Sequence, residues 1–310
     1  MAYEPLMEQK NTGYLFVYFT GEDESGEQVY FALSEDGLHW HDLNRGKPVL
    51  TSRIGERGVR DPFILRSSHD GNFYIIATDL RIASGKGWDA AQHRGSRSIV
   101  VWEATDLTHW SEERSIEMDL PEAGCVWAPE TIYDADSQEH LMFWASMTPS
   151  EGKAPKQIIY SSRTRDFRTF TRPEVFIERD NHVIDTSIIR AGERYYRFSK
   201  DETTKCILLE QGDSLAASSF ADIVSADLDH LLGVEGPAVF KFNDRDEWCL
   251  LVDQFMTNQG YLPMVTDDLA SGRFRVLSKE EYAMGATKKR HGSVLNLTAA
   301  EYAALKKAWG

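Results

Sequence analysis

Three shortages in the sequence each exclude a class of protein. No apolar run approaches the roughly 20 residues that a membrane-spanning helix needs. Lysine and arginine number 34 against 49 aspartates and glutamates, a net charge of −15, which argues against binding to nucleic acid or to an anionic membrane surface. The three cysteines, Cys125, Cys206 and Cys249, have no C-x-x-C spacing and predict reduced, packed thiols rather than a disulfide scaffold.

The first ten residues have neither the basic nor the apolar region of a secretory signal peptide. Together with the free thiols, this predicts a cytoplasmic protein. With 42% hydrophobic residues the chain can bury a large core. A neutral polar ligand such as a sugar is compatible with the acidic charge.

The apolar segments are short, rich in aromatic and β-branched residues, and separated by turn residues. Their length and composition favour strands over helices, for example at residues 14–19, 29–33, 73–78 and 140–144. Only the end of the chain, residues 298–308, has a helical pattern, in which Thr298 and Glu301 form a capping box. The chain is therefore predicted to be all-β with a short C-terminal helix.

Two series of motifs recur along the chain. The first places an aspartate in a turn before a large aromatic residue, at residues 34–40, 104–110, 164–170 and, more weakly, 266–274. The second opens a strand with a polar residue, at steps of 69, 55, 50 and 56 residues: Asp61, Glu130, Asp185, Glu235 and His291. Units of about 50 residues with several strands each are typical of a β-propeller, and five openings predict five blades.

The two ends of the chain complete this count. Only one strand and the helix follow His291, and the strands before Asp61 lack an opening strand. Joined, they make the last blade, which ties both ends into the ring. Residues 1–310 are therefore predicted to form a single catalytic domain.

The polar openings should converge at one mouth of the central channel, because first strands begin on the face where second strands end. Four of them are acidic, and three of these, Asp61, Asp185 and Glu235, are singled out because they start innermost strands beside small or proline residues. Clustered carboxylates repel one another, and partial burial raises their pKa values further. Two carboxyl groups with different pKa values are what the hydrolysis of a glycosidic bond requires, one as acid and one as base. The alternative is that each acid only caps a strand or pairs with an arginine.

The five opening motifs, in their order and spacing, resemble glycoside hydrolase family 43 over residues 13–297. They read Arg-Asp-Pro-Phe-Ile (60–64), Val-Trp-Ala-Pro-Glu (126–130), Val-Ile-Asp-Thr-Ser (183–187), Val-Glu-Gly-Pro (234–237) and Arg-His-Gly-Ser (290–293). The resemblance implies a five-bladed propeller of inverting enzymes that act mainly on α-L-arabinofuranosides and β-D-xylosides. The third motif lacks the proline that many members carry after the aspartate.

The same resemblance implies a role for each motif residue. It makes Asp61 the general base, Glu235 the general acid, and Asp185 the residue that orients the acid and tunes its pKa. It makes His291 a residue of the channel centre that holds a water or a calcium ion, although the chemistry requires no cofactor. We expect the neighbouring Asp61 and Asp185 to raise the pKa of Glu235, and the base and acid carboxyl groups to lie about 6.5–9.5 Å apart.

Five further residues are candidates for contact with the sugar: Arg60, Phe63, Trp88, Trp127 and Arg290. Trp127 can offer an apolar wall to a sugar ring or pack between blades. The two arginines can bind hydroxyl groups, offset the repulsion between the carboxylates or form surface ion pairs. Phe63, two residues after Asp61, is expected to point to the same side of its strand, where packing in the core is favoured over contact with the sugar. Trp88 belongs to a long polar loop, residues 81–97, and residues 147–156 are predicted to form a second loop. Loops at the mouth favour a pocket and exo-action on chain ends.

The sequence thus predicts an exo-acting, inverting α-L-arabinofuranosidase on arabino-oligosaccharides, with a β-D-xylosidase on xylo-oligosaccharides as the close alternative. A catalytically silent glycan-binding propeller would have lost one of the carboxylates, and all three are present. A retaining fructosidase-type enzyme would need an Asn-Asp-Pro-like nucleophile motif, and no Asn precedes Asp61. The oligomeric state is not readable from the sequence.

Overall fold

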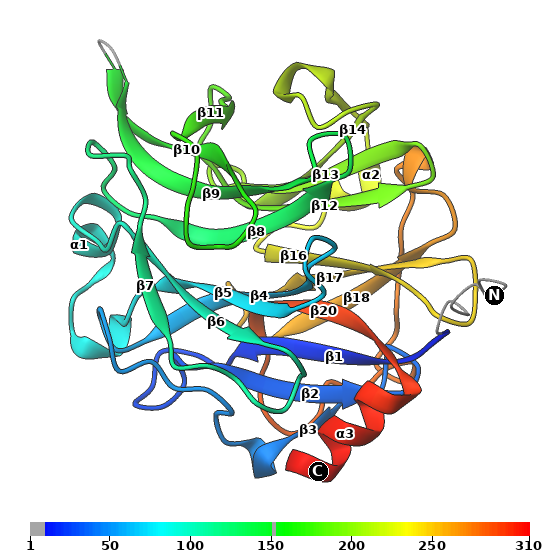
Figure 1. Cartoon of the computed structure of the whole chain (residues 1–310). Helices are drawn as coiled ribbons and strands as arrows, with labels where there is room; N and C mark the ends of the chain where they lie inside the picture. Colours follow the sequence, from blue (N-terminus) through cyan, green and yellow to red (C-terminus); the bar gives the residue numbers. More distant parts are fainter. Residues whose placement is uncertain (1–9, 151–152) are drawn as a thin grey trace, which may run out of the picture.

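A computed structural model describes residues 10–150 and 153–310, so the predictions on the first nine residues and on residues 151–152 lie outside the described part of the chain. Five four-stranded antiparallel sheets are arranged as the blades of a propeller, as predicted (Figure 1). In the described residues, no helix has both the length and the apolar character needed to cross a membrane.

Four blades are each built from consecutive strands. Blade one contains β4 (Val59–Arg66), β5 (Phe73–Asp79), β6 (Ser98–Ala104) and β7 (Arg114–Glu117). Blade two contains β8 (Trp127–Asp134), β9 (Glu139–Ser150), β10 (Lys153–Thr164) and β11 (Glu174–Ile177). Blade three contains β12 (Val183–Ala191), β13 (Arg194–Asp201), β14 (Cys206–Gly212) and β15 (Ala221–Asp222). Blade four contains β16 (Glu235–Lys241), β17 (Trp248–Asp253), β18 (Tyr261–Thr266) and β19 (Arg275–Val276).

The fifth blade joins the two ends of the chain, as predicted. Its innermost strand is β20 (Arg290–Thr298), which pairs with β1 (Asn11–Phe19), followed by β2 (Tyr30–Ser34) and β3 (His41–Asp42). The C-terminal helix α3 (Ala299–Trp309) begins with the predicted capping box between Thr298 and Glu301. In Figure 1 this red helix lies beside the blue strands of the N-terminal segment.

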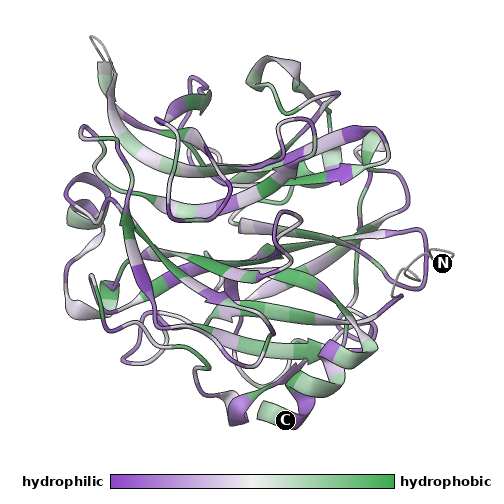
Figure 2. Cartoon of the chain, viewed as in Figure 1, coloured by the Kyte–Doolittle hydropathy of each residue, from purple (hydrophilic) through white to green (hydrophobic). Residues whose placement is uncertain are grey.

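The core fills the spaces between neighbouring blades. Colouring by hydropathy shows the apolar residues concentrated in the strands and the polar residues in the turns (Figure 2). Trp40, Trp102 and Trp144 are all at most 2% exposed. The first motif series forms the predicted turns, in which Asp36, for example, accepts backbone N–H groups of Leu38 and His39, both at 2.8 Å. All three cysteines are buried and free, as predicted.

Two connections differ from the predicted loops. Residues 81–97 contain a short helix, α1 (Trp88–His93), bounded by Gly87 and preceded by Gly85, both with positive φ angles. Residues 147–156 extend β9 and β10 into a long hairpin instead of a loop, because strand pairing continues from Met147 opposite Gln157 to Ser150 opposite Lys153. A second short helix, α2 (Ala226–Asp229), precedes blade four.

Candidate active site

A β-bulge near the start of each innermost strand turns selected side chains toward the channel mouth. The pairing register shifts at this point in every blade. In four blades a residue with a left-handed backbone lies there: Asp61 (φ 51°), Ala128 (φ 47°), Asp185 (φ 51°) and Gly236 (φ 54°). Non-glycine residues rarely adopt this conformation, and bulges that re-aim side chains are common beside active sites.

The bulges show which residues of the five opening motifs occupy equivalent positions, and these differ from the residues aligned in the sequence. Asp61, Ala128, Asp185 and Gly236 are equivalent positions, and in blade five the register shift spans His291. Glu130 therefore lies two residues beyond its bulge, and Glu235 one residue before its own. Gly236 is required there, because a Cβ atom would lie 2.6 Å from the imidazole of His291.

Two aspartates share one histidine at the centre of the site. His291 Nδ1 lies 3.4 Å from Asp61 Oδ1 and 3.7 Å from Asp185 Oδ2. Asp61 Oδ2 also accepts a hydrogen bond from Thr78 Oγ1 at 2.8 Å, and Asp185 Oδ2 accepts one from the Gly236 N–H at 3.1 Å. Burial alone would lower the pKa of His291, but Asp185 and Asp61 outweigh it and raise that pKa to about 10. The ring is therefore an imidazolium that links the two carboxyl groups.

The two aspartates differ in charge state. Burial would raise the pKa of Asp61, but its interaction with His291 and the nearby Arg60 outweigh burial and hold that pKa below its usual value. In Asp185 burial prevails, helped by the charges of Glu235 and Asp61, and raises the pKa to about 6. Asp61 is thus ionised over the range in which Asp185 titrates.

Glu235 is held by two cations. Its Oε1 lies 2.8 Å from Arg290 Nη2 and its Oε2 lies 2.8 Å from Lys200 Nζ. Burial would raise the pKa of Glu235, but Lys200 and Arg290 outweigh it and lower that pKa. The expectation that neighbouring carboxylates raise this pKa is therefore wrong, because the charges of the two paired cations outweigh them.

Lys200 and Asp253 lie at the ends of second strands, which were expected to face the mouth, but neither residue was assigned a role in the site from the sequence. Lys200 also pairs with Glu202 at 2.6 Å, and Asp253 Oδ2 accepts from Arg290 Nε at 2.6 Å. Asp253 is fully buried, and burial raises its pKa to about 6. These partners fix both cations in contact with Glu235.

Glu130 is buried on β8, where it feels the charges of His291, Asp185 and Asp61, and it lines neither chamber of the site. It is 4% exposed, and burial raises its pKa to about 8, so it is a neutral acid at pH 7. Its neutrality lets a third acidic residue sit close to Asp61 and Asp185 without adding a full negative charge.

The site is hollowed in two steps. The inner chamber has a volume of about 50 Å³, and the residues that line it alone are Asp61, Leu80, Asp185 and His291. The outer chamber, of about 340 Å³, adds Glu22, Gln92, Lys200, Glu202, Phe255 and Arg290. Both are lined by Arg60, Trp88, Trp127, Ile184 and Glu235. Glu235 therefore lies where the two chambers meet.

Of the five residues predicted to contact the sugar, three line both chambers, one lines the outer chamber alone, and one lines neither. Trp88 and Trp127 line both chambers and meet edge to face, with ring centroids 5.9 Å apart. Arg60 lines both chambers too, but its guanidinium is occupied by Glu27 at 3.1 Å and Glu22 at 3.3 Å. Arg290 lines the outer chamber through its pairing with Glu235.

Phe63 lines neither chamber. It packs against the apolar core between blades one and two. The expectation that it follows Asp61 on the same side of the strand is wrong, because the bulge between Arg60 and Phe63 breaks the two-residue alternation.

Glu27 is a buried carboxylate that no sequence motif singles out. Its carboxylate accepts hydrogen bonds from the Arg60 guanidinium and from the backbone N–H groups of Ile82 and Ala83, the last two at 2.9 Å. The closing blade thereby holds the loop that carries Trp88. Arg60 itself lies between the rings of Phe19 and Trp88, 4.5 and 4.9 Å from their centroids.

The calcium ion implied for the channel centre stays a prediction. Within residues 10–150 and 153–310, no three His, Cys, Asp or Glu side chains are grouped to hold one.

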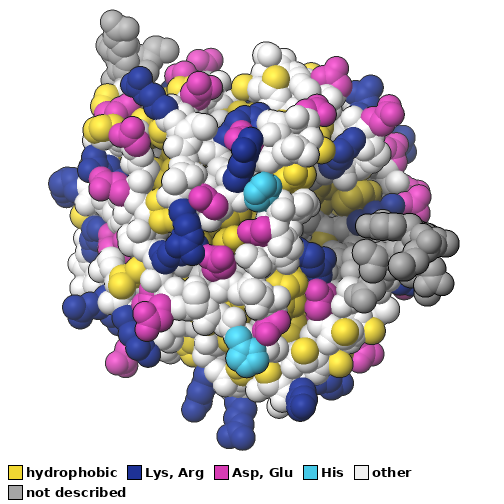
Figure 3. All heavy atoms as spheres, in the orientation of Figure 1, with side chains coloured by type: hydrophobic (Ala, Val, Ile, Leu, Met, Phe, Trp, Pro, Cys, Tyr) yellow, Lys and Arg dark blue, Asp and Glu magenta, His cyan; other side chains and the backbone are white. Residues whose placement is uncertain are grey.

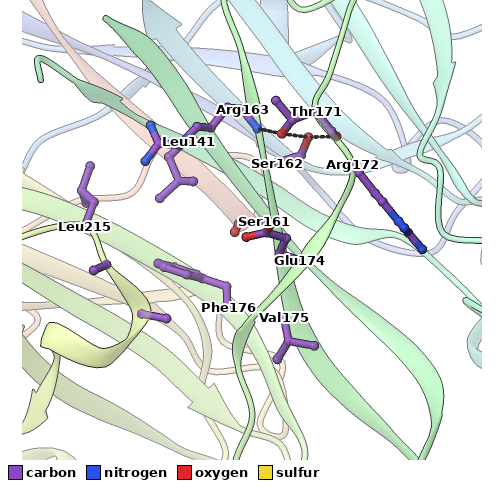
Figure 4. Close-up of a pocket in the computed structure, with 12 residues that line it drawn as sticks. Leu141, Ser161, Ser162, Arg163, Thr171, Arg172, Glu174, Val175, Phe176 and Leu215 are labelled. Carbon is purple, nitrogen blue, oxygen red and sulfur yellow. Dashed lines mark hydrogen bonds between the residues drawn. The ribbon is translucent and has the colours of Figure 1, made fainter. Parts of the chain in front are cut away.

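A second concavity, of about 400 Å³, lies between the outer strands of blades two and three (Figure 4). Its polar groups already bond to one another: Ser162 Oγ donates to the Thr171 carbonyl, and the Arg163 N–H donates to Thr171 Oγ1 at 2.9 Å. Glu174 is the one acidic residue in its lining, so it cannot provide an acid–base pair. On the face in Figure 3, basic and acidic side chains are interspersed, without a large patch of one sign.

Comparison with known families matches residues 9–303 to a family described as "Probable glycosyl hydrolase domain" and named as related to glycoside hydrolase family 43. A curated α-L-arabinofuranosidase of Bifidobacterium longum is 32% identical over 274 residues. That alignment covers 76% of this chain but 26% of the relative, so the match spans about a quarter of the relative's length.

Solved structures share the fold at low sequence identity. A family 43 β-1,3-galactosidase superposes with a TM-score of 0.62 at 12% identity, over 89% of this chain and 57% of that one. An α-L-arabinanase of Penicillium chrysogenum in complex with arabinobiose gives a TM-score of 0.55 at 12% identity, over 90% and 84% of the two chains. At this identity the likeness supports the five-bladed fold and nothing finer.

Proposed function

Because the chain belongs to the family of probable glycosyl hydrolases related to family 43, we propose that it is an exo-acting, inverting α-L-arabinofuranosidase that cleaves arabino-oligosaccharides. The observation that carries this proposal is the meeting of Asp61, Asp185 and Glu235 in one chamber, with Asp61 ionised and Glu235 at the boundary to the outer chamber. The arabinose preference is supported by the curated relative at 32% identity.

In this proposal the terminal sugar lies in the inner chamber and the rest of the substrate in the outer one. Asp61 takes the proton of a water that attacks the anomeric carbon, while the carboxyl group of Glu235 gives a proton to the leaving glycosidic oxygen. Water replaces the leaving group from the opposite face, so the product has inverted configuration. Thr78 and His291 orient Asp61, and the positive charge of His291 keeps it ionised.

Glu235 must carry a proton at the start of the reaction, whereas Lys200 and Arg290 favour its ionised form. The productive enzyme is therefore the fraction with Glu235 protonated and Asp61 ionised. In this proposal Asp185 is the residue that tunes the acid, and the charge of Glu235 contributes to the raised pKa of Asp185.

The test is the hydrolysis of aryl α-L-arabinofuranoside, aryl β-D-xyloside and arabinobiose by the wild type and Glu235→Gln. We expect release from the arabinoside, and a loss of about 10²–10⁴-fold for Glu235→Gln on arabinobiose, where the leaving alkoxide needs a proton. An aryl oxide needs less acid assistance, so the loss there should be smaller. Glu247→Gln, in a surface glutamate paired with Arg245, serves as the control. Release from the xyloside alone would replace the arabinose assignment, and release from none of the three would refute the proposal.

A further inference from the structure

We propose that the outer chamber selects a neutral sugar as the leaving group, with Phe255 as its apolar wall and the Gln92 amide as its hydrogen-bonding group. This inference rests on the proposed function and extends it from the sugar that is released to the part of the substrate that leaves.

Glu235 fixes which chamber holds the leaving group. The proton of a general acid goes to the glycosidic oxygen, which lies between the released sugar and the leaving group. Asp61, the base, lines the inner chamber and is absent from the outer lining. Because acid and base work on opposite sides of the released sugar, that sugar belongs to the inner chamber and the leaving group to the outer one.

Phe255 is the one aromatic residue that lines the outer chamber alone, whereas Trp88 and Trp127 line both. It follows β17 and is partly exposed. Lys200 Nζ lies 4.1 Å from its ring centroid and restrains the ring's orientation. A restrained aromatic ring suits the apolar C–H surface of a sugar, since little side-chain freedom is lost on binding.

Gln92 supplies a free polar group on α1. Its side-chain amide makes no hydrogen bond to the part of the protein that the structure describes, and it lines the outer chamber. An amide can both donate to and accept from a hydroxyl group, so it suits a neutral sugar.

The charged groups of this chamber leave no cation for an acidic sugar. Arg60 pairs with Glu22 and Glu27, Lys200 with Glu202 and Glu235, and Arg290 with Glu235 and Asp253. A uronate would meet the carboxylates of Glu22 and Glu202 at the wall without gaining an unpaired partner.

The test compares substrates that differ only in the leaving group. α-L-Arabinofuranosyl fluoride places a single atom in the outer chamber, whereas arabinobiose places a sugar there. We expect Phe255→Ala and Gln92→Ala each to lower kcat/KM for arabinobiose about tenfold more than for the fluoride. Met256→Ala, at an exposed neighbour outside the lining, is the matched control and should change neither. Equal losses on both substrates, or no loss on arabinobiose, would overturn the inference.

A second pair of substrates tests the charge. We compare 4-carbamoylphenyl with 4-carboxyphenyl α-L-arabinofuranoside, whose leaving groups carry a neutral amide and a carboxylate. We expect kcat/KM of the wild type to be about tenfold higher for the amide. Equal rates would overturn the neutral-sugar assignment. Wild-type protein that cleaves none of the arabinosides would refute the proposed function and this inference together, whereas the outcomes above refute the inference alone.

Discussion

The propeller uses aspartate at two repeating positions, and the two sets have different partners. Asp36, Asp106 and Asp166 lie in the outer turns, where each carboxylate accepts two backbone N–H groups within three residues. Asp61 and Asp185 lie at the inner bulges, where a strained backbone turns them toward His291.

The partners explain the difference. Although burial acts in the opposite direction, backbone N–H groups and nearby side chains lower the pKa of Asp36 to about 2, so this charge supports the fold. Burial raises the pKa of Asp185 to about 6, so its charge opposes the fold at neutral pH. A carboxylate satisfied by its own turn builds structure, and one held at a cost among other charges is available for chemistry.

The largest expected effect separates the two sets by activity. Asp61→Asn removes the base while keeping the shape, and we expect kcat on arabinobiose to fall by about 10²–10⁴-fold. Asp36→Asn is the matched change at a turn, where an amide oxygen still accepts the N–H groups, so activity should be retained. Steady-state kinetics of both variants measures this. An equal loss of activity in Asp36→Asn and Asp61→Asn would contradict the assignment of different roles to the two sets of aspartates.

A second prediction concerns the pH dependence of the acid. Lys200 lowers the pKa of Glu235, which must be protonated to act, so activity is lost as pH rises through that pKa. Lys200→Met should move the alkaline limb of the kcat/KM profile to higher pH. Lys205→Met is the control, because Lys205 pairs with Glu202 and not with Glu235. An unshifted limb in Lys200→Met would mean that another group sets it.

A third prediction compares stabilities. The folded pKa of Asp185 lies above its unfolded value, so ionisation destabilises the fold as pH rises from about 4 to above 6. Asp185→Asn should therefore increase the free energy of unfolding at pH 7 by about 1–2 kcal/mol while activity falls. Urea unfolding at pH 7 and pH 4 measures this, and the gain should shrink at the lower pH. A loss of stability at pH 7 would show that the carboxylate stabilises the fold.

The smallest expected effect is at the turns. Asp36→Ala removes the acceptor for the N–H groups of Leu38 and His39, and should lower the free energy of unfolding by about 1 kcal/mol. Because the folded pKa of Asp36 is depressed, its contribution is present above the unfolded pKa of about 4 and lost as pH falls toward 2. Unfolding curves that are identical for wild type and variant at pH 7 would contradict this account of the turns.

Periodicity and turn chemistry were sufficient to predict the blades, the joined fifth blade and the capped helix, because these depend on local residue types. The convergence of Asp61, Asp185, Glu235 and His291 also followed from topology, since every innermost strand begins at the same mouth. The bulges could not be predicted, because a single extra residue leaves the motif readable but changes where Phe63 points. The state of Glu235 depends on Lys200 and Arg290, which lie 35 and 55 residues away in the chain.

The central claim is that Asp61 and Glu235 act together in a single displacement at the anomeric carbon. The most direct measurement is proton NMR of the first sugar released from an α-L-arabinofuranoside by the wild-type protein. The account predicts that β-L-arabinofuranose appears first and the α anomer only later, through mutarotation. Initial release of the α anomer would mean a retaining mechanism and would contradict the assignment of Asp61 as the base.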